Sequence, residues 1–182
     1  SADGNTGVGA GVFAALTTGD NNVAVGLSAL AVNTTGYDNV GIGRRALDAN
    51  ISGLANVGIG SSALTANTTA GSNVAVGTCA MFVNTTGANN TAIGTVALAA
   101  NTTGQYNVAV GKQALQANTT ASDNVAVGTE AMQQNTTGAS NTAVGKSVLT
   151  ANTTGGQNTG IGKQALDANI SGANNTAAGF EA

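Results

Sequence analysis

Hydrophobic and polar residues recur along this chain with one fixed period of 17 residues. Each repeat opens with Asn and continues with Val or Thr, then Ala or Gly, then mostly Val or Ile, then Gly. The opening Asn occurs eleven times without a slip, from Asn5 and Asn22 to Asn175. Taking this Asn as position 1, every residue can be described by its position in the repeat. Such strict periodicity predicts a stack of identical structural units.

Positions 2 to 4 predict a short β-strand. In Val108, Ala109 and Val110, β-branched residues flank a small one, which is the period-2 alternation of a strand. Position 5 is Gly in every copy, which predicts a sharp bend or a positive φ that ends the strand. Because both faces of the strand are apolar, we expect both to be buried.

The rest of the repeat predicts a coil closed by turns. Adjacent apolar residues at positions 8 and 9, such as Ala114 and Leu115, cannot share one strand face, so a corner or a single helical turn is expected. The phrase Asn-Thr-Thr-Gly at positions 12 to 15 predicts a second turn, because Asn and Gly tolerate left-handed dihedral angles. One strand and two turns predict an all-β fold, with each repeat forming one rung of a β-solenoid or β-roll.

Stacked rungs place like residues above one another at about 4.7 to 4.8 Å, so the array would span about 50 Å. Three sets of rows follow from this. The predicted structural core is Val25, Ile42, Val76, Val110, Val127, Leu98 and Leu115. The predicted turn ladder, in which Asn amides bond to one another, is Asn33, Asn67, Asn101, Asn118, Asn135 and Asn152. The candidate interface between chains, where small side chains let backbones approach, is Ala75, Ala92, Ala109, Ala126 and Ala143.

Residues 1–182 are predicted to form a single repeat array without a linker or domain boundary. Both ends fall within a repeat, so we expect the array to be a fragment of a longer fibre. Each rung offers only three large apolar side chains, at positions 2, 4 and 9. Such a thin core predicts that rungs must stack and that several chains share an interface.

Composition excludes several function classes. Charged residues make up 7% of the chain and the net charge is -3, so there is no basic surface for nucleic acid. His is absent, Cys79 is the single Cys, and the acidic residues are scattered one by one, so we expect no catalytic or metal site and no cofactor. No apolar run approaches the roughly 18 residues that cross a bilayer, so no membrane insertion is expected.

Variable residues indicate the outer surface. Almost all charged and aromatic residues lie at positions 6, 7, 10, 16 and 17. Asn-Thr-Thr is also a glycosylation sequon. Turn chemistry alone accounts for the same residues and is the favoured interpretation.

The phrases NVAVGKQALQANTT from Asn107 and NTAVGKSVLTANTTGGQNTGIGKQAL from Asn141 resemble the repeats of bacteriophage tail fibres and large bacterial surface adhesins. NVAVG is also similar to the NSVAIG phrase of YadA-like trimeric autotransporter adhesin heads. The resemblance covers essentially the whole chain. It implies a parallel homotrimeric fibre, extracellular at a cell or virion surface, that attaches to a receptor or glycan. The 17-residue rung is longer than that of YadA-like heads, so an extra corner must be accommodated.

Two other functions stay open beside an attachment fibre. One is a single-chain solenoid that assembles end to end into an extracellular filament, since sheet edges can template further strands. The other is a binder of ice or crystal surfaces through repeated Thr. Adjacent residues such as Thr102 and Thr103 would point to opposite sides of an extended segment, which weakens this alternative.

Overall fold

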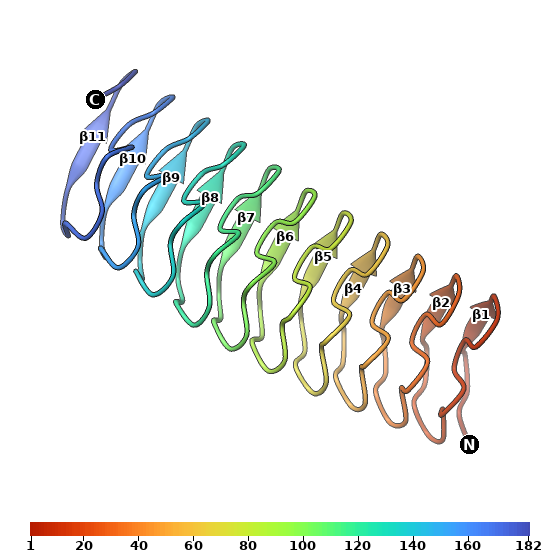
Figure 1. Ribbon diagram of the computed structural model, residues 1–182. Helices are drawn as coiled ribbons and strands as arrows, with labels where there is room; N and C mark the ends of the chain where they lie inside the picture. Colours follow the sequence, from red (N-terminus) through yellow and green to blue (C-terminus); the bar gives the residue numbers. More distant parts are fainter.

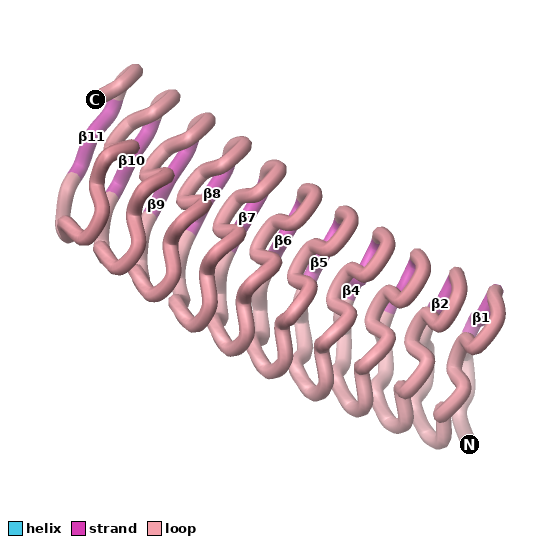
Figure 2. Tube along the Cα trace, in the orientation of Figure 1, coloured by secondary structure: helices cyan, strands magenta, loops and turns pink.

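The computed structural model describes all residues 1–182 and shows a parallel β-solenoid with 17-residue rungs (Figure 1). Each rung contributes one strand of three residues, and turns make up most of the rest (Figure 2). No helix is present. The strands are β1 Thr6–Val8, β2 Val23–Val25, β3 Val40–Ile42, β4 Val57–Ile59, β5 Val74–Val76, β6 Thr91–Ile93, β7 Val108–Val110, β8 Val125–Val127, β9 Thr142–Val144, β10 Thr159–Ile161 and β11 Thr176–Ala178.

All strands belong to one parallel sheet in chain order, β1 to β11. Ala92 pairs with Ala109 and Ile93 with Val110, so equal positions of successive repeats lie directly above one another. The predicted stacking of one repeat per rung is therefore confirmed.

The Gly at position 5 ends each strand, as predicted. Gly94 has a φ of 137°, a conformation that L side chains rarely adopt. A Cβ on Gly94 would also lie 2.5 Å from the carbonyl oxygen of Gly111 in the next rung. A side chain is therefore excluded here for two reasons: the φ angle is unfavourable for any residue except Gly, and the next rung lies too close.

The corner at positions 7 to 9 contains no helical turn. Instead, single residues adopt the left-handed conformation at positions 7, 9 and 17, as in Gln113 (φ 60°), Leu98 (φ 52°) and Tyr106 (φ 56°). This conformation costs a non-Gly residue about 1 to 2 kcal/mol. Hydrogen bonds to neighbouring rungs hold it in place, including one from Leu98 N to the carbonyl oxygen of Ala114 (2.9 Å).

The core lies between the strand and the segment of positions 8 to 12 that runs back past it, here called the return limb. It is filled by Ala at position 3, Ala or, in one rung, Val148 at position 8, and Leu or Met at position 9. Leu98 and Leu115 are fully buried, so this part of the predicted core is confirmed.

The predicted roles of the two strand faces are reversed. Position 4 faces outward: Ile42 and Val127 are each 37% exposed. Val25, Val76 and Val110 are half-buried on the same outer side, so none of these five residues belongs to the core. Position 3 faces inward, and its Ala residues cannot be an interface between chains because all of them are fully buried: Ala75, Ala92, Ala109, Ala126 and Ala143.

The thinness of the coil explains this reversal. A Cβ on Gly41 would lie 3.3 Å from both the Leu30 side chain and the carbonyl oxygen of Ala46. The return limb therefore comes so close to the strand that only Gly or Ala fits at position 3. Val or Ile on this side would overpack the interior.

Two ladders of buried Asn side chains complete the interior. In the predicted turn ladder at position 12, Asn101 Nδ2 donates to Asn84 Oδ1 (2.9 Å) and to the carbonyl oxygen of Gly104 (3.0 Å). The same amide-to-amide bond is made by Asn67, Asn118, Asn135 and Asn152, while Asn33 starts the ladder by accepting from Asn50 Nδ2, so the turn ladder is confirmed. The Asn at position 1 forms a second ladder, in which the Asn107 backbone N and Nδ2 both donate to Asn90 Oδ1. No buried side-chain polar atom lacks a partner.

Candidate interaction surface

The outer side of the sheet is a row of β-branched residues that is continuous from β1 to β10 and ends with Ala178 at position 4 of β11. Positions 2 and 4 of β1 to β11 form this surface, which we call the outer sheet face. Its position 4 residues expose between 36% and 61% of their area in several rungs, as in Ile59, Ile161 and Val8. Isolated exposed apolar residues occur on any protein surface. Apolar residues that adjoin one another along a rod form a contiguous patch, and such patches mark interaction sites.

The outer sheet face is smaller than one partner's share of a standard protein interface. Eleven strands at about 4.8 Å give a length of about 50 Å, and two outward residues with their side chains give a width of about 10 Å. The product, about 500 Å², compares with about 800 Å² that each partner contributes to a standard protein interface. The flanking edges would have to supply the remainder.

Charges are separated onto the two edges that flank this face. All basic residues lie at positions 6 and 7, in the narrow turn directly after the strand, and we call this the basic edge: Arg44, Arg45, Lys112, Lys146 and Lys163. Half of the acidic residues lie at positions 16 and 17, in the wider turn before the next strand, and we call this the acidic edge: Asp3, Asp20, Asp38 and Asp123. The two turns lie at opposite ends of each rung (Figure 1).

Few of these charges are neutralised within the chain. The single ion pair joins Arg45 to Asp48 (3.6 Å), and Lys163 lies 5.0 Å from the centre of the Phe180 ring. Arg44, Lys112 and Lys146 are exposed without an acidic partner, and so are Asp38 and Asp123 without a basic one. Glu130 and Glu181 share the basic edge at position 7, but no basic residue lies on the acidic edge.

The paired Thr residues have different surroundings. At position 13, Thr102 Oγ1 donates to the carbonyl oxygen of Thr119 in the next rung (3.0 Å). At position 14, the Thr103 side chain is exposed and makes no hydrogen bond. Each Thr-Thr pair therefore presents one free hydroxyl and not two, and the two repeats with Ile-Ser at positions 13 and 14 have no Thr there. Asn118, which precedes the pair Thr119 and Thr120 and forms a sequon with it, is fully buried.

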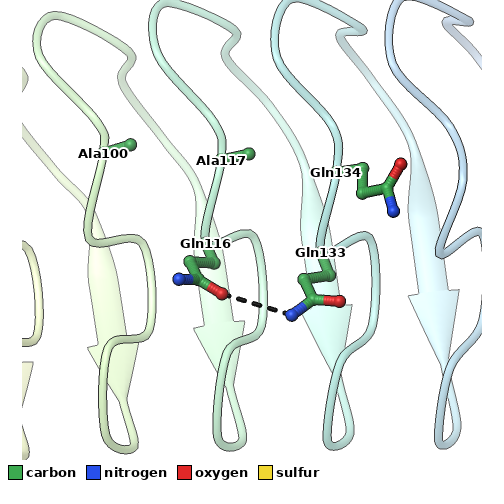
Figure 3. Close-up of a pocket in the computed structure, with 5 residues that line it drawn as sticks. All are labelled: Ala100, Gln116, Ala117, Gln133 and Gln134. Carbon is green, nitrogen blue, oxygen red and sulfur yellow. Dashed lines mark hydrogen bonds between the residues drawn. The ribbon is translucent and has the colours of Figure 1, made fainter.

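The surface has one depression, a shallow hollow of about 480 Å³ on the return limb (Figure 3). Gln116 Oε1 accepts hydrogen bonds from Gln133 Nε2 (3.2 Å) and from Gln113 Nε2 (3.1 Å) at its rim. Ala100 and Ala117 form its floor because position 11 is small in these rungs. The hollow offers amide groups but no nucleophile and no acid or base.

Chemically reactive side chains do not converge elsewhere. No group of three His, Cys, Asp or Glu residues is close enough to hold a metal ion. Cys79 is a free thiol, half-buried at position 7. No helix is long and apolar enough to span a membrane.

Reasoning from sequence missed the outer sheet face and the separation of charge. One signal could have revealed the face: position 2 holds Thr in several repeats, including Thr91, Thr142 and Thr159. A hydroxyl group is poorly suited to a dry core, because burying it without a partner costs free energy. Sorting the charged residues by position in the repeat would have revealed the two edges.

Comparison with protein-family models, with curated proteins and with solved structures finds no match to this chain.

Proposed function

We propose that this chain forms the structural shaft or head of an extracellular attachment fibre, assembled as a parallel homotrimer and without enzymatic activity. One observation carries the proposal. An outer sheet face of β-branched residues runs unbroken from β1 to β10, and no concave site of reactive groups interrupts it. A surface of this kind suits lengthwise packing against copies of itself better than it suits turnover of a substrate.

The trimer interface proposed here is the outer sheet face and not the Ala row. Each copy turns its positions 2 and 4 toward the shared axis, where Val and Ile of three chains form a dry seam. Burying the exposed parts of these side chains adds the apolar core that a single 17-residue rung lacks. Receptor or glycan contacts of the cell-surface or virion fibre then fall on the outward-facing return limb.

The mass of the 182-residue chain in solution tests this assembly. Light scattering should give three times the chain mass of 17.3 kDa, with a β-rich circular dichroism spectrum. Monomers, or particles that grow without limit, would contradict the trimer and leave the single-chain filament as the function to pursue.

Two neighbouring substitutions distinguish the interface from the core. Val110→Lys places a charge on the outer sheet face and should release monomers that keep their spectrum. Ala109→Leu overfills the interior, where Ala109 is fully buried, and should abolish the fold itself. Thr103→Lys, at an exposed position away from the face, should change neither property. Monomers with Ala109→Leu and an intact trimer with Val110→Lys would place the interface elsewhere.

A further inference from the structure

The outer sheet face is bordered by opposite charges along its two long sides. The acidic edge comes directly before each strand and the basic edge directly after it. Asp38 on the acidic edge and Arg44 on the basic edge lie just before and just after β3, at almost the same height along the rod. Neither residue forms an ion pair within the chain.

This arrangement distinguishes the two ways in which copies can pack through the face. When two rods pack face to face and antiparallel, each edge meets the same edge of its neighbour, so Arg and Lys meet Arg and Lys. When the rods are parallel and related by rotation about the fibre axis, the basic edge of one meets the acidic edge of the next. Facing like charges destabilises a complex, whereas complementary edges stabilise it and bias orientation.

We propose that the two edges are an electrostatic docking surface for a second copy of this chain, joined in parallel with Arg44 facing Asp38 of the neighbour. This inference rests on the proposed parallel assembly and names the residues that orient it. The contact is directional, basic edge to acidic edge, so the same contact repeats around a closed ring.

Ring closure fixes the register. A shift of one rung at each contact would accumulate around the ring and leave it open as a helix, so a closed trimer requires equal rungs to lie side by side. At that register Arg44 of one chain and Asp38 of the next differ in height by six residues of a 17-residue rung. This is about 2 Å along the axis, because one rung rises by about 4.8 Å. Lys112 and Asp123 are eleven residues apart, about 3 Å along the axis. Long basic side chains can bridge both offsets.

Charge reversal tests the contact directly. Arg44→Glu sets Glu against Asp38 of the neighbour, and Asp38→Arg sets Arg against Arg44. Each should weaken trimer formation on the order of 100-fold, because three contacts per ring change from attraction to repulsion. The double variant Arg44→Glu, Asp38→Arg restores opposite charges and should return to within about threefold of the original chain. Asp167→Arg, an equal charge change on the return limb, is the matched control and should have little effect.

A thiol crosslink reports orientation independently. Cys79 lies on the basic edge, and Ser72→Cys adds a thiol to the acidic edge beside the same rung. A short bismaleimide should join the two thiols between parallel copies and produce covalent trimers. It cannot join them within one chain, because the edges lie at opposite ends of the rung. Adding Cys79→Ser should abolish the product.

Sedimentation equilibrium and denaturing gels distinguish the outcomes. Weakening by each reversal, rescue by the double variant and covalent trimers would support the docking edges. A trimer that is insensitive to both reversals, or that does not crosslink, would overturn the edges while leaving the fibre assembly intact. A monomeric parent chain would overturn both.

Discussion

Replacing Asn107 by Ala tests whether buried amides hold the rungs together. The Asn107 side chain donates to Asn90 Oδ1 (3.1 Å) and to the carbonyl oxygen of Ala121 (2.9 Å). Its Oδ1 accepts from the backbone N (3.1 Å) and from Nδ2 (3.2 Å) of Asn124. The substitution removes all four hydrogen bonds, and the Ala side chain can form none in their place.

The cost depends on which groups keep a partner. Asn90 Oδ1 still accepts from the backbone N of residue 107, and the carbonyl oxygen of Ala121 still accepts from Asn118 Nδ2. The buried backbone N–H of Asn124 keeps none, because its single partner is Asn107 Oδ1. An orphaned N–H costs about 1 to 3 kcal/mol and each of the three further lost bonds about 1 kcal/mol, so we expect a total of about 4 to 6 kcal/mol.

Guanidinium unfolding followed by circular dichroism measures this loss, at a fixed chain concentration because association adds to stability. Thr103→Ala removes an exposed side chain that makes no hydrogen bond and should cost less than about 0.5 kcal/mol. A loss below about 1 kcal/mol for Asn107→Ala would refute the reasoning, because the ladder would then contribute no more than surface residues do.

Asn107→Asp distinguishes hydrogen bonding from shape. The carboxylate has the size of the amide but cannot donate to Asn90 Oδ1 or to the carbonyl oxygen of Ala121. Burial raises the pKa of the new carboxyl, so stability should fall as the pH rises above about 4, where the unfolded chain ionises. At pH 7 this variant should be less stable than Asn107→Ala, and it should recover in acid. Equal stability at both pH values would contradict a buried ladder.

Four further substitutions or assays test other features. Gly94→Ala should cost more than about 3 kcal/mol in the same unfolding assay, because it combines a forbidden φ with a clash, whereas exposed Thr95→Ala should cost little. Val96 is β-branched and has a φ of 52°, a left-handed conformation that Asn adopts more readily than Val. Val96→Asn should therefore raise the free energy of unfolding by about 1 kcal/mol. An unchanged or lower midpoint of guanidinium unfolding would show that the Val96 backbone is not strained. Asn118 should resist an oligosaccharyltransferase in the folded chain but accept a glycan in an unfolded peptide, as read by mass spectrometry. Thermal hysteresis should be absent, because each Thr-Thr pair offers only one free hydroxyl, at position 14; a measurable difference between the melting and freezing temperatures would support ice binding instead.

Sequence periodicity predicted the rung and its turns correctly for physical reasons. An invariant Gly such as Gly111 marks a backbone conformation that other residues avoid, and recurring Asn such as Asn101 marks a turn and a ladder. These signals are local, so they can be read without knowing which segments come together.

The strand faces could not be assigned in the same way. Both sides of Val108, Ala109 and Val110 are apolar, and hydrophobicity alone favours burial of the larger residues. The deciding quantity is the distance between the strand and the return limb, which depends on the left-handed residues at positions 7 and 9. Leu98, in particular, gives no sign in the sequence that it adopts a positive φ, because Leu disfavours that conformation.

The Asn ladders also give the rod a direction. In both ladders the amide of each rung donates to the oxygen of the rung before it, as from Asn118 to Asn101 and from Asn107 to Asn90. The upper and lower surfaces of any rung are therefore different, one presenting NH₂ groups and the other presenting oxygens. A rung can be added to the stack in one orientation only, since inverting it would set donor against donor or acceptor against acceptor. The rod is thus polar along its axis, and whole 17-residue units can be gained or lost without disturbing that polarity.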